Sequence, residues 1–398
     1  MTLSLDRIKL GTAVALLLAG TALAADGLRF SDFTPLSASA SPTANETTPI
    51  TFGNAEFAQQ SIADRKTQLE LGRPNSGNWD MIAVNETGPH KGRYLFTVFE
   101  TGQSGVQRTD LVSGQTDTIW QSPVLLGHVA FDAVYWTPWG TLITAEESWE
   151  TNPKGSTSPY GRLFELQNPL DAPGIFDPVT AASNSNADFV HQNVIPRVSH
   201  EGIQFDKAGN MYFIDELNGG SLYKYTPAAK FNKVKHSRDY FEAGQTFVLR
   251  VGNGATPNAT GAFTWVPITD ATGAGLPGTL TITDTRNVTS VDARNTTDLA
   301  AFKGTDYQRP EDLQIQTVRG AEYLYVATTT TNEVYRLNLS ANTSVFSPTA
   351  ALSTWPPARP WVRRWPAPTI SPSTTKATST LSKTATAAWT MTSGLRRI

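Results

Sequence analysis

The stretch RVSHEGIQFDKAGNMYFIDELNGGSLYKYTP, residues 197–227, contains most of one repeated structural unit. Three short runs of strand-forming residues, at 203–205, 211–214 and 222–225, are separated by turn-forming residues. The Asn-Gly-Gly sequence at 218–220 is typical of a turn between antiparallel strands. An acidic residue, Glu201, precedes the first run, and another, Glu216, follows the second. We therefore expect three antiparallel strands with a carboxylate at two fixed points.

The same pattern occurs three more times along the chain. The copies cover residues 310–337, 132–166 and, more weakly, 80–100. Repeats that are too small to bury their own faces must stack on one another or surround an axis. Blades of short strands around a channel account for both the repeats and the length of the chain. The sequence therefore predicts an all-β fold, a β-propeller.

The composition excludes several classes of function. The net charge is -3 with 17% charged residues, which gives no sign of a nucleic-acid partner or of binding to a membrane surface. There is no cysteine, so disulfides and thiolate metal ligands are impossible. We expect a monomer that acts on a small molecule.

The chain divides into four parts. Residues 1–24 carry Arg7, Lys9, an apolar run and Ala22-Leu23-Ala24, which together predict a signal peptide and a periplasmic or secreted protein. After its removal no membrane contact is expected. Residues 25–75 are predicted to wrap the propeller domain, which spans 76–346, and 347–398 form an irregular tail. Within the domain, 230–305 is expected to supply another blade with a long insertion, and 252–278 to be a loop.

Carboxylates recur at equivalent positions of the repeats. Equivalent positions of successive blades converge near the axis, because the innermost strand of each blade lines the channel. Carboxylates gathered there would repel one another or take up protons unless a cation neutralised them, and oxygen ligands favour Ca²⁺ or Mg²⁺. The alternative is that these acids cap turns and face solvent. One set is Asp80, Asp132, Glu201 and Glu311, and the other is Glu100, Glu147 and Glu216.

Two further residues are candidates for catalysis. Arg309 stands beside Glu311 and Asp312, and a guanidinium at a metal-filled channel suits a tetrahedral oxyanion. The alternative is a structural Arg–Glu pair. His200, next to Glu201, could serve as an acid, a ligand or a packing residue. The histidines have no metal-binding spacing.

Three stretches carry a resemblance to a known family. Residues 137–147 (TPWGTLITAEE), 199–202 (SHEG) and 309–312 (RPED), the last followed by YVATTT at 325–330, resemble the PhoX-type alkaline phosphatases, which are secreted bacterial propellers. The likeness covers roughly residues 75 to 340. It implies six blades, hydrolysis of phosphate esters, calcium and, in well-known members, iron. It also implies metal ligands at Glu100, Glu147, Glu201 and Glu311, with Arg309 as a phosphate contact.

Two departures from the family pattern affect the expected cofactor and the export signal. The family places a cysteine, an iron ligand, immediately before the paired glutamates, where this chain has Ala145. Many members also carry a twin-arginine export signal, which is missing here. Iron is therefore disfavoured, and calcium is the expected cofactor.

The sequence thus predicts a calcium-dependent phosphatase for small phosphate esters. Two alternatives remain: a noncatalytic calcium-stabilised propeller that binds a ligand or partner, and a lactonase-like calcium propeller. Only Arg309 discriminates, because an anionic substrate needs it and a lactone does not. The candidate catalytic residues are Arg309 and His200, and the candidate metal ligands are Glu100, Glu146, Glu147, Glu201, Glu216 and Glu311.

The tail from residue 347 is rich in Ser, Thr, Pro, Ala, Trp and Arg and lacks strand patterning. A low-complexity linker is one interpretation. The other is out-of-frame translation, because joining each third codon base to the next codon permits 369–394 to be read as a repeat of 206–220. This hypothesis predicts a frameshift near residue 346 and the loss of the last blade. The 398-residue product should then be unstable and poorly active, and sequencing the coding DNA tests the idea.

Overall fold

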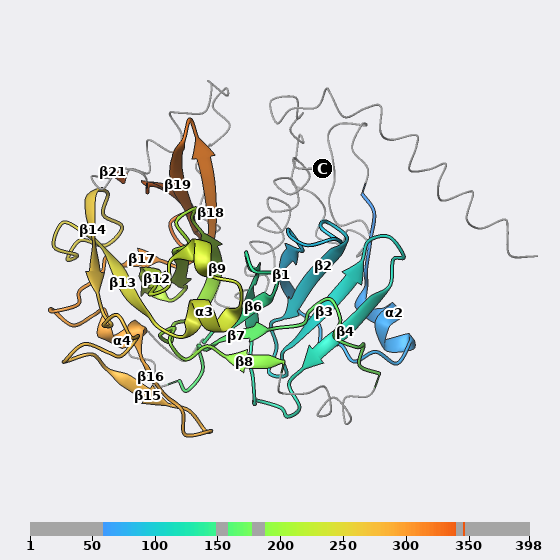
Figure 1. Cartoon of the computed structure of the whole chain (residues 1–398). Helices are drawn as coiled ribbons and strands as arrows, with labels where there is room; N and C mark the ends of the chain where they lie inside the picture. Colours follow the sequence, from blue (N-terminus) through green and yellow to red (C-terminus); the bar gives the residue numbers. More distant parts are fainter. Residues whose placement is uncertain (1–58, 149–157, 177–187, 340–344, 347–398) are drawn as a thin grey trace, which may run out of the picture. The chain divides into compact units, whose positions relative to one another are not determined.

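The computed structural model describes residues 59–148, 158–176, 188–339 and 345–346 (Figure 1). The chain divides into two compact units, Met1–Ser61 and Ile62–Ile398, and every feature below belongs to the second. The expected signal peptide, most of the expected wrapping segment and the tail with its predicted frameshift lie outside the described residues. Among the described residues, no helix is long and apolar enough to cross a membrane.

Strands form most of the regular structure, and the first two sheets each contain four antiparallel strands that pair in chain order. The first sheet comprises β1 (Trp79–Val84), β2 (Tyr94–Phe99), β3 (Gly105–Asp110) and β4 (Thr116–Gln121). The second comprises β5 (Phe131–Trp136), β6 (Leu142–Glu146), β7 (Leu163–Leu166) and β8 (Phe189–His191).

The third and fourth sheets also pair their strands in chain order, and the third gains one more strand at its edge from the end of the described chain. The third contains β9 (His200–Phe205), β10 (Met211–Asp215), β12 (Leu222–Pro227), β13 (Gly244–Val251), β14 (Gly261–Pro267) and β21 (Val345–Phe346). The fourth contains β18 (Pro310–Val318), β19 (Ala321–Thr328) and β20 (Glu333–Asn338). Two small ladders join β11 (Asn218–Gly220) to β17 (Tyr307–Gln308) and β15 (Thr281–Thr283) to β16 (Thr289–Val291). The helices are short: α2 (Arg65–Glu70), η3 (Phe231–Lys233), α3 (Ser237–Phe241) and α4 (Ala293–Thr296).

The first strands of the four sheets lie against one another in chain order, β1 against β5, β5 against β9, and β9 against β18. Sheets of consecutive antiparallel strands that meet through their first strands are the blades of a β-propeller. The predicted all-β propeller is therefore confirmed. The described residues form four blades, and the six that the family resemblance implies are not reached within them.

Residues 197–227 fold largely as their pattern predicts. Met211 on β10 stands opposite Phe205 on β9 and Tyr225 on β12, so the three runs form one antiparallel unit. The Asn-Gly-Gly turn is present, with Gly219 at φ 85° and the Gly220 N–H donating to the Leu217 carbonyl at 2.6 Å. Its backbone also pairs with β17, a contact that the local pattern does not predict.

The prediction for residues 230–305 is wrong in two respects. β13 and β14 extend the third blade instead of forming another one. β14 also lies inside the range 252–278, which was predicted to be a loop. Ala262 and Thr264 are exposed while Phe263 and Trp265 are half-buried, so this strand has the alternation of a half-covered edge.

The apolar cores lie between blades. On β10, Met211 and Phe213 belong to the core shared with the second blade, whereas Tyr212 and Ile214 belong to the core shared with the fourth. Successive side chains of a strand point to opposite faces, so each inner blade has two buried faces. A fully buried large apolar side chain contributes about 1.5–3 kcal/mol, and neighbouring blades contribute side chains to the same cores.

Candidate metal centre

One backbone hydrogen bond recurs in every blade and defines its equivalent positions. The residue after the second strand donates its N–H to the carbonyl of the residue before the first strand, at 2.8–3.0 Å. We call the second residue of the first strand the strand-start position, and the residue after the second strand the strand-end position. The four donor–acceptor pairs are Glu100 and Asn78, Glu147 and Ala130, Glu216 and Ser199, and Thr329 and Arg309.

The strand-start positions are occupied by acids in all four blades. They hold Asp80, Asp132, Glu201 and Glu311, and the strand-end positions hold Glu100, Glu147, Glu216 and Thr329. The equivalence that the repeats predict is therefore borne out by the backbone. The fourth blade differs, because it has Thr329 where the others have glutamate.

A β-bulge accompanies each strand-start acid. In all four blades the register between the first two strands shifts at this point, as between Phe131↔Glu146 and Ala133↔Ala145 on either side of Asp132. A bulge inserts one extra residue and bends its strand, which redirects the side chain at that point. The same irregularity in each blade therefore aims the acids in a corresponding direction.

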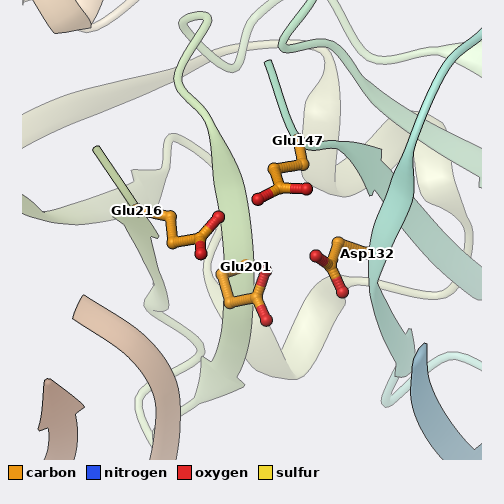
Figure 2. Close-up of side chains that lie close together, drawn as sticks. All are labelled: Asp132, Glu147, Glu201 and Glu216. Atoms are coloured by element: carbon orange, nitrogen blue, oxygen red, sulfur yellow. The ribbon is translucent and has the colours of Figure 1, made fainter. Parts of the chain in front are cut away.

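Four of these acids form what we call the acidic cluster, which consists of Asp132, Glu147, Glu201 and Glu216. All four are buried, and one oxygen atom from each lies within 4.8 Å of those of the other three. Figure 2 shows the carboxyl groups arranged around a shared space. A second group, Asp80 and Glu100, meets the first through Asp132. The acidic cluster thus combines residues from two blades, and the second group adds residues from the first blade.

The electrostatics of the cluster disfavour the ionised state when no cation is bound. Burial raises the pKa of Glu147 well above its usual value, and Glu216 raises it further. Burial likewise raises the pKa of Glu201, with contributions from Asp132 and Glu216. Oε2 of Glu201 has no hydrogen-bond partner among the described residues. These carboxyl groups must take up protons or bind a cation.

Arg309 lies beside the cluster, at a position where the other blades have uncharged residues. Its guanidinium pairs with Glu216 and lies 3.0 Å from Oε1 of Glu311, which also accepts a hydrogen bond from Thr329. Although burial works against its charge, Glu216 and Glu311 hold the pKa of Arg309 above its usual value. Its backbone has a φ of 53°, in the left-handed region that is uncommon for arginine.

The predicted site residues fall into two groups. Glu147, Glu201 and Glu216 meet in the acidic cluster, Glu100 lies in the adjoining group, and Glu311 is held by Arg309. Glu146 does not join them. It accepts hydrogen bonds from Arg162, whose Nε lies 2.7 Å from its Oε2. Successive residues of an extended chain point in opposite directions, so the side chain of Glu146 faces away from that of Glu147.

His200 also lies apart from the grouped carboxylates. Its ring packs against Phe213 with 5.4 Å between ring centroids, and neither ring nitrogen has a hydrogen-bond partner among the described residues. Burial, together with Arg294, lowers the pKa of His200 to about 3. The imidazole is therefore neutral near pH 7 and packs against Phe213, and its catalytic role stays a prediction.

Two acids of these groups, Asp80 and Asp132, are not among the metal ligands predicted from the sequence. Asp132 belongs to both groups, and Asp80 belongs to the second. The signal was present, because both occupy the same repeat position as Glu201 and Glu311.

The fold and the cluster define a propeller with a buried carboxylate site on its inner strands. The family model of alkaline phosphatase PhoX matches residues 115–360, more than half of the 398-residue chain. The chain belongs to the alkaline phosphatase PhoX family. No curated protein matches the chain.

The solved structures that are similar to this chain include three at 11–15% identity. PhoX of Pseudomonas fluorescens, in complex with vanadate, a transition state analogue, has 15% identity and a TM-score of 0.45, covering 68% of this chain and 66% of that one. A quinonprotein alcohol dehydrogenase-like protein from Bacteroides thetaiotaomicron has 12% identity and a TM-score of 0.29, covering 67% and 54%. A putative oxidoreductase (glucose dehydrogenase) from Thermus thermophilus has 11% identity and a TM-score of 0.29, and the match covers 73% of this chain and 85% of that one. The chain spans just under two thirds of the Pseudomonas PhoX chain.

Proposed function

We propose that this chain is a secreted, calcium-dependent phosphatase of PhoX type that hydrolyses phosphate monoesters. One observation carries the proposal: four buried carboxyl groups come within 4.8 Å of one another on the inner strands of a protein of this family. The pattern of residues 1–24 supports export to the periplasm or beyond.

The residues present suit calcium. All the donor atoms of the acidic cluster are carboxylate oxygens, and Ca²⁺ takes six to eight oxygen ligands in flexible geometry. The unpartnered Oε2 of buried Glu201 is an atom that a cation would satisfy. Ala145, which stands where the family has a cysteine, is fully buried in apolar surroundings.

The chain's own residues have separable roles in this proposal. Asp132, Glu147, Glu201 and Glu216 would hold one ion, and Asp80 with Glu100 could hold a second that shares Asp132. When bound, calcium would act as a Lewis acid that offsets the charge on the phosphoryl oxygens.

Arg309 would bind two phosphoryl oxygens through its planar guanidinium. It now pairs with Glu216, a cluster residue, so a cation at the cluster would compete for that carboxylate and free part of the guanidinium. In the reaction, water adds to phosphorus and the bond from phosphorus to the ester oxygen breaks. The alcohol leaves with one proton of the water. The role of Arg309 favours a phosphatase over a lactonase, whose neutral substrate does not need the cation.

Hydrolysis of p-nitrophenyl phosphate by the intact protein tests the proposal. Activity should be lost on calcium chelation and should return when calcium is added. Arg309→Ala should lower kcat about 100- to 1,000-fold, the usual effect of removing one preorganised donor to an oxyanion. Arg319→Ala is the matched control, because Arg319 also has a positive φ of 51° but is exposed at the opposite end of β18.

Two results would contradict the proposal. One is turnover that persists unchanged after chelation. The other is an Arg309→Ala variant that keeps full activity. The thermal transition of Arg309→Ala must match that of Arg319→Ala, so that lost activity reports on the guanidinium and not on the fold.

A further inference from the structure

The connection between the first and second blades exposes three consecutive large apolar side chains. Val124 is 59% exposed, Leu125 70% and Leu126 58%. Single exposed apolar residues are common on protein surfaces, but a contiguous group marks a binding surface more often. We call these three residues the apolar wall.

Hydrogen bonds fix the apolar wall in place. The Leu126 N–H donates to the Gly102 carbonyl at 2.8 Å, and the Tyr160 hydroxyl donates to the Leu126 carbonyl at 2.8 Å. The Ser122 hydroxyl donates to the Val124 carbonyl, also at 2.8 Å. Leu126 has a φ of 60°, which is uncommon for a residue with a large side chain. The exposed leucines therefore belong to a defined loop conformation.

The apolar wall adjoins the candidate metal centre. Leu125 and Leu126 each place a methyl carbon 3.5–3.6 Å from where a side chain on Gly102 would begin, two residues beyond Glu100. The Ala130 N–H, two residues before Asp132, donates to the Thr101 carbonyl at 2.8 Å. The loop that carries the wall is thus hydrogen-bonded to the segment that follows Glu100.

Strand direction places both features at the same end of the first blade. β1 begins and β2 ends at the acids, and because the strands are antiparallel, β3 begins and β4 ends there too. The wall begins three residues after the end of β4. Val112, which is 75% exposed, lies in the turn between β3 and β4 at the opposite end.

We propose that the apolar wall binds the leaving group of the substrate, and that the substrates are phosphate monoesters of apolar alcohols or phenols. The inference rests on the proposed phosphatase function. Cations at the acidic cluster and Arg309 bind the phosphoryl group, so the ester oxygen and its substituent extend out of the cluster. A substituent that passes Glu100 meets Leu125 and Leu126. These two side chains make apolar contacts with an aryl or alkyl group and none with a hydroxylated group.

The test compares phenyl phosphate with glycerol 3-phosphate on the intact, calcium-loaded protein. Leu125→Ser and Leu126→Asn should each lower kcat/KM for phenyl phosphate about tenfold, and change that for glycerol 3-phosphate less than twofold. Asparagine tolerates the positive φ at 126, so that variant keeps the loop conformation. Val112→Ser, which changes another exposed apolar residue at the far end of the blade, should change neither value.

Inhibitor binding separates this inference from the proposed function. Phenylphosphonate should bind more tightly than methylphosphonate, and the two wall variants should remove that preference. If the unchanged protein hydrolyses both esters and the variants lose both equally, the phosphatase stands and the wall inference fails. If no ester is hydrolysed but the phosphonate preference is present and depends on the wall, the function fails and the binding site stands.

A membrane contact is the competing role for such a loop. Sedimentation with phosphatidylcholine vesicles distinguishes it. If Leu125→Ser abolishes vesicle binding while the phenylphosphonate preference is unchanged, the wall faces lipid and the inference is overturned.

Discussion

Glu146 and Glu147 are neighbours in the chain and both are buried, yet their surroundings are opposite in charge. Glu146 accepts hydrogen bonds from Arg162 and from the Val129 N–H. Glu147 lies among the carboxyl groups of Asp132, Glu201 and Glu216. The first glutamate is neutralised by the protein itself, and the second is not.

Glu146 belongs to what we call the ion-pair network, which consists of Glu146, Arg162, Arg197, Asp284 and Arg286. Arg162 reaches Asp284 at 3.3 Å, and Asp284 also pairs with Arg197 at 3.4 Å and with Arg286 at 2.7 Å. Burial opposes ionisation of Asp284, but hydrogen bonds from Arg286 and Val288 hold its pKa well below its usual value. A buried carboxylate with its own arginine serves the fold, whereas a buried carboxylate among carboxylates needs a cation from outside.

Breaking the ion-pair network should have the largest effect on stability. Arg162→Met leaves Glu146 buried without its cation, which should cost about 3–5 kcal/mol in the free energy of unfolding. Urea unfolding measures the loss, which should be the same with and without calcium. Lys66→Met, which removes an exposed ion pair with Glu70 at 3.8 Å, is the control and should leave the stability almost unchanged. An Arg162→Met protein as stable as that control would contradict a structural role for the network.

Calcium binding should have the next largest effect on stability, and it should act through the acidic cluster. An ion at 100 times its dissociation constant stabilises the folded state by about 2.7 kcal/mol. A calcium titration followed by thermal unfolding measures this shift. Glu201→Gln should abolish most of it, whereas Glu70→Gln, on exposed α2, should not. An unchanged calcium response in Glu201→Gln would remove that residue from the site.

Relative to the calcium-loaded protein, the metal-free protein should lose stability as pH rises above about 5. The pKa values of Glu147 and Glu201 are raised in the folded state, and that of Asp312 is raised to about 6 by burial and by Asp80. Between the unfolded and folded pKa values, the folded state binds more protons, so unfolding becomes easier as pH increases. The slope is about 1.4 kcal/mol per pH unit for each proton. Denaturation at pH 5, 6 and 7 with chelator and with calcium measures the difference. The buried histidines His128, His191 and His200, whose pKa values are lowered to about 3, give a slope of the opposite sign that is common to both states and cancels in the comparison. A difference in stability between the two states that does not widen from pH 5 to pH 7 would contradict the assignment.

Removal of one charge from the cluster should give the smallest effect, with the opposite sign to the Arg162 change. Glu147→Gln relieves repulsion with Glu216 and should stabilise the metal-free protein by about 1 kcal/mol. The same variant should bind calcium more weakly by calorimetry. If Glu147→Gln destabilised the metal-free protein, the neighbouring carboxylates would not be acting as a repulsive group.

Local sequence pattern was enough to predict the blades and the equivalent acids, because both depend on short-range periodicity. The two strands around Asp206–Asn210 and the positions of Glu201 and Glu216 follow from one stretch of sequence. The opposite surroundings of Glu146 and Glu147 do not, since Glu146 pairs with Arg162, which lies just before β7 and in turn meets Asp284, 122 residues further along. β14 was missed because glycine and threonine flank its alternating Phe263 and Trp265. The frameshift near residue 346 stays a prediction.

The placement of apolar cores between blades also determines how the molecule opens. A blade with neighbours on both sides cannot separate from one without exposing the face that the other covers, so the second and third blades should open only in the largest fluctuations. Every residue of β1 is only half-buried, and Val334 on β20 is 47% exposed. Among the four described blades, amide hydrogens of the first and fourth should therefore exchange with solvent well before those of β6 and β10.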